Sequence, residues 1–153
     1  MSPMRSLLVL FSYHHNNTEK VAKVFAKVLD AEIKTPEHID PEELRGYGLI
    51  GFGSGIYGEK HHEALLGLAD RLPQATGGKA FIFSTSSNLE PLSKNHSSLR
   101  EILRSKGYAV VDEFTCAGFN TNSFIKYFGG LNKGRPNADD LRRAEEFALS
   151  LLK

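Results

Sequence analysis

Continuous apolar runs alternate with segments of helical periodicity along the whole chain. The runs lack the strict alternation of half-exposed strands, and this is typical of parallel strands that are buried on both faces. We expect strands at 6–12, 31–34, 46–53, 79–84 and 108–116. Apolar residues three and four positions apart predict helices at 18–29, 61–72, 95–106 and after Asn137.

Residues with known capping preferences mark the ends of two of these helices. Gly107 follows the helix expected at 95–106 and suits the left-handed conformation that often ends a helix. Asn137 is a good N-cap residue, and Asp139 and Asp140 place negative charge in the first turn, where the helix dipole favours it. These signals support the predicted boundaries.

The order of elements predicts an α/β fold with a doubly wound, five-stranded parallel sheet and helices on both faces. We expect a single domain over residues 1–153, since this length suits one hydrophobic core. In such sheets the ligand lies beyond the carboxyl ends of the strands, where the strand order reverses. The segments to inspect are therefore 12–18, 54–62, 84–91 and 116–136.

Composition narrows the classes of partner and compartment. The net charge of +1 comes from interspersed acidic and basic residues, so we expect neither nucleic-acid nor membrane binding. The first apolar run is too short to span a membrane. A single cysteine, Cys116, excludes an internal disulfide and a multi-cysteine zinc site, and we expect it to be buried near a strand end. A cytoplasmic location is the default expectation.

The first of these segments leads into a helix N-terminus, where unpaired backbone N–H groups and the helix dipole favour an anion. Asn16, Asn17 and Thr18 add side-chain donors. The segment has neither the lysine motif of nucleotide triphosphatases nor the glycine fingerprint of dinucleotide-binding proteins. A phosphate monoester held by neutral donors fits it better.

The other two segments suit a planar ring. In GSGIYGEKHH, three glycines allow close approach of the backbone to a ligand, and Tyr57 offers an aromatic face for stacking. STSSNLEP is rich in hydroxyl and backbone hydrogen-bonding groups that can contact the polar edge of a heterocycle. Each segment alone also fits an ordinary turn, but all three are expected at the same edge of the sheet.

VLFSYHHNNTEKVAKVF resembles the phosphate-binding signature of the flavodoxin family, with Phe11, Asn17, Thr18 and Ala22 at the family's spacing. GSGIYG and STSSN resemble the family's second and third flavin loops, and the resemblance spans essentially the whole chain. It implies noncovalent binding of FMN. The residues that it implies for this site are Ser12, Tyr13, His14, His15, Asn16, Asn17, Thr18, Ser54, Gly55, Ile56, Tyr57, Gly58, Ser84, Thr85, Ser86, Ser87 and Asn88.

The chain departs from the family pattern in its phosphate segment. Tyr13 replaces a hydroxyl residue, Asn16 replaces a small residue, and His14 and His15 stand where small polar residues are common. The histidine pair can donate to the phosphate, belong to a solvated turn or, with distant histidines, bind a metal. We expect the first of these and predict no metal site.

Two further features bear on the flavin's surroundings. The third segment lacks an aromatic residue for the second flavin face, which leaves Leu89, Pro91 or a residue of 119–127 to cover it. His61 and His62 are expected at a helix start in a structural or solvent-facing role. Acid or base catalysis by an imidazole is left open, because imidazoles titrate near neutral pH. The segment 129–137 is expected to be a loop.

We expect an electron carrier that passes electrons between redox partner proteins, such as a reductase and a ferredoxin-type donor or acceptor. The flavin supplies the chemistry in such a protein, so no catalytic residue is expected. The alternative is an FMN-dependent NAD(P)H reductase that acts on a quinone or similar small acceptor. A third reading is a flavin-free binding module of the same fold. A monomer or a weak homodimer is expected.

Overall fold

The computed structural model describes residues 5–12, 17–57, 60–75, 77–86, 92–117 and 136–152. The strands are β1 (Ser6–Phe11), β2 (Glu32–Lys34), β3 (Leu49–Tyr57), β4 (Lys60–His61), β5 (Lys79–Ser86) and β6 (Ala109–Ala117). The helices are α1 (Asn17–Leu29), α2 (Glu63–Asp70), α3 (Leu92–Asn95), α4 (Ser97–Ser105) and α6 (Ala138–Leu151). Two 3-10 helices, η1 (Pro36–His38) and η2 (Pro41–Gly46), join β2 to β3.

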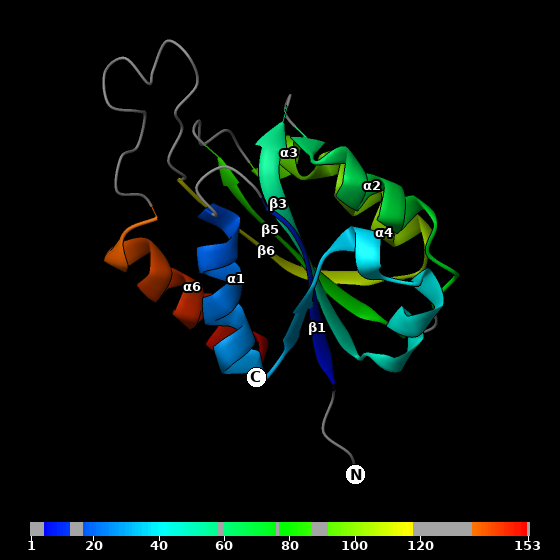
Figure 1. Cartoon of the computed structure of the whole chain (residues 1–153), viewed down its shortest axis with the longest axis horizontal. Coiled ribbons are helices and arrows are strands. Elements are labelled where there is room, and N and C mark those ends of the chain that lie inside the picture. Colours follow the sequence, from blue (N-terminus) through cyan, green and yellow to red (C-terminus); the bar gives the residue numbers. More distant parts are fainter. Residues whose placement is uncertain are drawn as a thin grey trace.

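Five parallel strands form the sheet, as the sequence predicts, and their order is β2-β1-β3-β5-β6. Helices α1 and α6 cover one face, and α2, α3 and α4 lie on the other (Figure 1). A sixth strand, β4, pairs antiparallel with the end of β3. The fold is therefore the predicted doubly wound α/β sheet with one added hairpin.

The hairpin corrects the expectation of a loop at 54–62. Strand β3 continues to Tyr57, and Ile56 and Tyr57 pair with His61 and Lys60. Isoleucine and tyrosine favour extended backbone, and their pairing outweighs the glycines that indicated a loop. The third segment also begins inside a strand, since β5 continues to Ser86.

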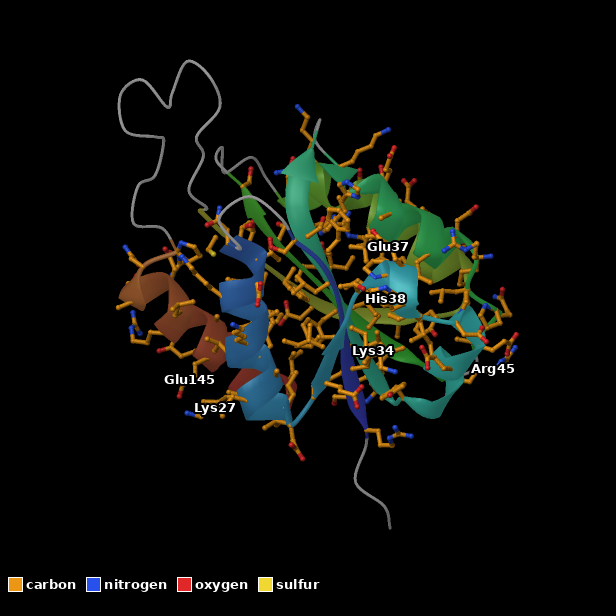
Figure 2. The ribbon with its side chains drawn as sticks, viewed as in Figure 1. Lys27, Lys34, Glu37, His38, Arg45 and Glu145 are labelled. Carbon is orange, nitrogen blue, oxygen red and sulfur yellow. The ribbon has the colours of Figure 1, made fainter. Side chains whose placement is uncertain are left out.

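The two faces of the sheet have separate hydrophobic cores. On the α2/α4 face, Phe52 and Ile82 of the sheet pack with Leu65 and Leu68 of α2. On the α1/α6 face, an aromatic cluster surrounds Phe25 of α1, whose ring makes edge contacts with Phe81, Phe83 and Phe114. Charged side chains such as Lys27 and Arg45 lie on the outside (Figure 2).

Two glycines of β3 make room for this aromatic cluster. A Cβ atom on Gly53 would lie 2.1 Å from the ring of Phe83, and one on Gly51 would lie 2.3 Å from the ring of Phe81. The rings therefore lie directly against the backbone of β3. The glycines at 51 and 53 are needed because two phenylalanine rings occupy the space of their missing side chains.

Two predicted helix ends agree with the structure, whereas the helix expected from residue 61 begins at Glu63, because His61 lies in β4. Gly107 has φ +89° after α4, and Asn137 caps α6 in a capping box with Asp140. The helix expected at 95–106 is divided, because α3 ends at Asn95 and α4 begins at Ser97.

Strand β6 lies at one end of the strand order and contains a bulge. Ala80 pairs with Val110 and Phe81 pairs with Asp112, so Val111 is an extra residue without a partner position on β5. The side chain of Val111 is exposed.

Candidate functional site

The described parts of the three predicted segments meet at the carboxyl edge of the sheet. Phe11, Ser54, Ser84 and Thr115 occupy one row across β1, β3, β5 and β6. In a parallel sheet, residues of one row point to the same face, so these four share the α2/α4 face. The edge lies at the top of Figure 1, where α1 begins.

The first segment combines a strand end with a helix start. Strand β1 ends at Phe11, and α1 begins at Asn17 with Glu19 in its first turn. The hydroxyl oxygen of Ser12 is buried and has no hydrogen-bond partner among the described residues. An orphaned hydroxyl beside a helix N-terminus is an unused donor where an anion is favoured.

A hydrogen bond joins the first segment to the third. The hydroxyl oxygens of Thr18 and Thr85 lie 2.8 Å apart, and both side chains are buried. Thr18 lies in the first turn of α1, and Thr85 lies near the end of β5. The contact fixes the start of α1 against the central part of the sheet edge.

The second segment is held by Ser54 and His62. The Ser54 hydroxyl donates to the carbonyl oxygen of Gly55 and accepts from the His62 backbone N–H. His62 is the N-cap of α2, because its Nδ1 accepts from the N–H of Ala64, and its ring stacks on Phe11 with ring centroids 3.6 Å apart. His62 therefore has the structural position that the sequence predicts. Gly55 and Ile56 lie in β3 beside this arrangement.

The remaining predicted site residues lie outside the described residues, as do Leu89, Pro91 and 118–135. The role of the histidine pair in the first segment therefore stays a prediction. The site residues concerned are Tyr13, His14, His15, Asn16, Gly58, Ser87 and Asn88.

A buried polar network at the same edge was missed by sequence reasoning. The Ser84 hydroxyl oxygen lies 2.7 Å from Nε2 of His96 and 2.9 Å from the hydroxyl oxygen of Thr115. The other nitrogen of His96, Nδ1, lies 2.8 Å from Oε1 of Glu113. Arg100 donates to both carboxylate oxygens of Glu113 at 2.7 Å.

The carboxylate of Glu113 is ionised in this network. Burial raises the pKa of Glu113, but the hydrogen bonds from His96 and Arg100 outweigh it and hold the pKa at about 2. A carboxylate without a proton is only an acceptor. Nδ1 of His96 therefore carries a hydrogen and donates a hydrogen bond to Oε1 of Glu113.

His61 belongs to the same cluster but differs in its protonation. Its ring centroid lies 4.8 Å from that of His96, and its Nε2 lies 2.9 Å from the carbonyl oxygen of Phe83. Burial, followed by repulsion from His96, lowers the pKa of His61 to about 3. The neutral ring thus donates from Nε2, and its buried Nδ1 lacks a hydrogen-bond partner among the described residues.

One sequence signal could have identified part of the network. His96 and Arg100 are four residues apart in a predicted helix, and this spacing places both on one helix face. Glu113 and Thr115 alternate along a strand and so share one face of it. Polar residues at such positions are usually solvated, and only the packing of α4 on β6 shows that they meet.

Three further findings concern chemistry elsewhere in the described residues. Cys116 is buried near the end of β6, as predicted. The described ranges contain no group of three or more histidine, cysteine, aspartate or glutamate residues that could hold a metal ion. No helix within them is long and apolar enough to cross a bilayer.

Comparison with solved structures identifies the fold. Oxidised Flavodoxin 2 from Bacillus cereus superposes with a TM-score of 0.72 at 18% identity and covers 97% of both chains. A Fusobacterium nucleatum flavodoxin bound to flavin mononucleotide gives a TM-score of 0.67 at 13% identity, over 97% of this chain and 98% of that one. No protein-family model matches the chain.

A sequence relative covers almost the whole chain. The uncharacterized protein MJ0298 from Methanocaldococcus jannaschii is 46% identical over 150 residues, which are 98% of this chain and 99% of that protein. Identity at this level over nearly the whole of both sequences implies a shared fold. This chain therefore belongs to the same family as MJ0298, and its fold is flavodoxin-like.

Proposed function

We propose that this protein binds FMN noncovalently at the carboxyl edge of the sheet and carries electrons between redox partner proteins. The observation that supports this most is the buried hydroxyl of Ser12, directly after β1, which has no hydrogen-bond partner among the described residues. A buried donor without a partner is costly, and a bound phosphate would satisfy it. The flavodoxin-like fold supports the same ligand, since a Fusobacterium nucleatum flavodoxin of this fold is bound to flavin mononucleotide.

The phosphate of FMN is assigned to the first segment. The Ser12 hydroxyl and the backbone N–H groups at the start of α1 are neutral donors, and the helix dipole adds a favourable field. The Thr18 hydroxyl bonds to that of Thr85, and this contact fixes the start of α1. When Thr85 is the donor in this pair, the Thr18 O–H is left to donate to the phosphate.

The ring of FMN is assigned to the ends of β3 and β5. The hydroxyls of Ser84 and Thr85 already bond to protein groups, so they shape this edge and leave the backbone of the strand ends to contact the ring. The hairpin of β3 and β4 supplies the backbone of Gly55 to Tyr57 on the other side. When bound, the isoalloxazine stores and releases the electrons.

An electron carrier needs no nucleophile or general acid at this edge, and its substrates are other redox proteins. A reductase and a ferredoxin-type protein are the classes of partner that fit this role. If the FMN-loaded protein rapidly oxidised a nicotinamide and reduced a quinone, it would instead be a reductase. Kinetic measurements with these two substrates therefore separate the two functions.

The test is a titration of flavin-free protein with FMN, followed by kinetics. We expect the protein to quench FMN fluorescence at a stoichiometry of one and to show the visible bands of a bound flavin. We expect slow oxidation of NADPH in the presence of a quinone and rapid reduction of the flavin through a partner reductase. Unquenched FMN would overturn the proposal, and rapid quinone turnover would replace the carrier by the reductase.

A further inference from the structure

A cavity of about 360 Å³ lies at the amino edge of the sheet, opposite the candidate flavin edge. Its wall is formed by segments that directly precede β3, β5 and β6, and it includes Arg45, Gln74 and Tyr108. These three strands are neighbours, and their first residues lie in one row of the sheet. The segments before them therefore meet at one place, and the volume suits a small organic molecule.

The hydroxyl of Tyr108 is a polar group of this wall that lacks a partner. The residue is only 7% exposed, because its ring packs edge-on against Phe52 and lies so close to Gly78 that a Cβ atom there would be 2.9 Å away. The hydroxyl makes no hydrogen bond to the residues that the structure describes. Burial raises the pKa of Tyr108, which keeps the hydroxyl protonated at neutral pH. The wall thus holds a fixed O–H donor that has no acceptor.

The charge around the cavity is positive. Arg45 belongs to the wall, and its charge acts on the phenol of Tyr108, where it opposes the larger effect of burial on the pKa. Arg5 lies 4.5 Å over the ring of Tyr47, another residue of the wall. None of the described wall residues is acidic. Glu42, outside the wall, pairs with Nε of Arg45 at 2.7 Å, so the two Nη groups of Arg45 remain for a ligand. Two guanidinium charges against one carboxylate leave room for one further negative charge.

The rest of the wall suits a short ligand body. Leu44, Pro73 and Ala75 add apolar side chains. Gly77 and Gly78 add backbone N–H groups that make no hydrogen bond within the described part of the chain. A Cβ atom on Gly77 would meet no atom within 4 Å, so the space beside this residue is open. The wall therefore combines hydrogen-bond donors with a modest apolar surface, which fits a small molecule with one charged group.

The same surroundings distinguish between kinds of anion. Helix α2 ends at Asp70 and α4 ends at Ser105, so the negative ends of both helix dipoles lie at this edge of the sheet. Their field disfavours a phosphate dianion, whose charge would also exceed the single surplus positive charge. A carboxylate carries one charge, and its two oxygens can accept from a phenol O–H and a guanidinium N–H together.

We propose that the cavity at the amino edge binds a small monocarboxylate, with the hydroxyl of Tyr108 donating to one carboxylate oxygen and Arg45 balancing the charge. The ligand binds without forming or breaking a covalent bond. The inference goes beyond the proposed function and does not rest on it, because the two sites lie at opposite edges of the sheet and share no residue. A failure of FMN to bind would leave this site unaffected.

The test is an NMR titration of the ¹⁵N-labelled full chain, flavin-free and FMN-saturated, with acetate, lactate and benzoate. These three monocarboxylates differ in size. Benzamide serves as the neutral analogue of benzoate, and inorganic phosphate at equal ionic strength serves as the competing anion. We expect at least one carboxylate to shift the amide resonances of Gly77 and Gly78 in a saturable manner, with and without FMN. Benzamide and phosphate should not do so.

Y108F and R45Q test the two groups that hold the ligand, and R142Q is the matched control. Y108F removes only the hydroxyl and should weaken binding of the tightest carboxylate about tenfold or more, since hydrogen bonds to charged groups are strong. R45Q should weaken it about two- to fivefold, because an exposed charge contributes less. Arg142 pairs with Asp139 at 2.6 Å, as Arg45 pairs with Glu42 at 2.7 Å, and the two arginine side chains are 61% and 57% exposed. R142Q should leave the affinity unchanged.

The stability of Y108F separates a ligand site from a structural role. Since the hydroxyl has no partner among the described residues, its removal should leave the midpoint of urea unfolding unchanged or higher. A lower midpoint would mean that the hydroxyl supports the fold, and this would contradict a donor kept for a ligand. The site would also be overturned if no carboxylate shifted the two glycine resonances, if phosphate bound more tightly than all three carboxylates, or if Y108F bound as tightly as the wild type.

Discussion

The hydroxyl groups of Thr18 and Thr85 form a buried hydrogen bond of 2.8 Å between residues that are 67 positions apart in the chain. It joins the first turn of α1 to the end of β5, so two of the three candidate flavin segments are held in a fixed relation. A part of the site is thus built before any ligand is present, which lowers the cost of ordering it on binding.

Replacing either threonine by valine should destabilise the protein. T18V or T85V leaves the other hydroxyl buried without its partner, which costs about 1–3 kcal/mol in the free energy of unfolding. The double variant should lose less than the sum of the two, because no orphaned hydroxyl remains. Urea unfolding of the four proteins measures these differences.

Thr35 provides the control for this cycle. Its hydroxyl contacts His38 on the surface, so T35V should change the free energy of unfolding by less than about 0.5 kcal/mol. Additive losses in the T18V and T85V pair would show that the two hydroxyls do not depend on each other.

Ser12→Ala should separate ligand binding from stability. Removing an unpartnered hydroxyl should leave the free energy of unfolding of the flavin-free protein unchanged or higher. FMN affinity should fall by roughly 0.5–1.5 kcal/mol through the loss of a phosphate donor. Fluorescence titration and urea unfolding test the two halves of this prediction.

Ser150→Ala is the matched variant, since the Ser150 hydroxyl donates to a carbonyl on the exposed part of α6. It should leave FMN affinity unchanged. Equal affinities for wild type and S12A would remove Ser12 from the phosphate site.

Stability should decline as the pH falls from about 6.5 to about 3 because of His61. Burial lowers the pKa of this imidazole to about 3 from its ordinary value of about 6.5, so between these values the unfolded chain binds a proton that the folded chain does not. The contribution of neutral His61 to the free energy of unfolding is therefore fully present above about pH 6.5 and decreases toward about pH 3. Urea midpoints measured across this range should show the decline.

H61Q removes the titrating imidazole, so its free energy of unfolding should depend less on pH. H38Q removes an exposed imidazole instead and should show the same pH dependence of stability as the wild type. If the urea midpoint of H61Q fell with pH as steeply as that of the wild type, groups other than His61 would cause the acid sensitivity.

Gly53→Ala should destabilise the sheet, and Gly67→Ala should not. An added Cβ at residue 53 meets the buried ring of Phe83 at 2.1 Å, and such overpacking costs about 1–3 kcal/mol. At residue 67, inside α2, the nearest atom to an added Cβ is 3.4 Å away on the flexible Arg71 side chain, so alanine should gain about 0.5–1 kcal/mol of helix stability. In thermal unfolding, we expect the midpoint temperature of G53A to lie below that of the wild type and that of G67A to lie above it.

The sequence was informative where one local pattern determines the structure. The apolar run at 6–12 and the helical spacing at 18–29 each depend on neighbouring residues, and β1 and α1 appear within one residue of these bounds. The hairpin of β3 and β4 was not predicted, because glycine-rich sequence suits both a turn and a strand end. Only the pairing of Ile56 with His61 distinguishes the two.

The candidate site was predictable in its position but not in its internal bonding. The rule for doubly wound sheets places Ser12, Ser54 and Ser84 at one edge, and the structure does so. The bond between His96 and Glu113 depends on the packing of α4 against β6, which no spacing in the sequence reveals. Long-range polar contacts of this kind require the fold before they can be seen.

The bulge at Val111 has a consequence for how copies of this protein meet in concentrated solution. An outer strand with regular pairing groups can recruit the outer strand of another molecule and extend one sheet into the next. In β6 the extra residue interrupts that regular repeat, and the neighbouring Asp112 adds negative charge that repels an identical strand. This margin of the molecule is thereby protected against aggregation by strand addition.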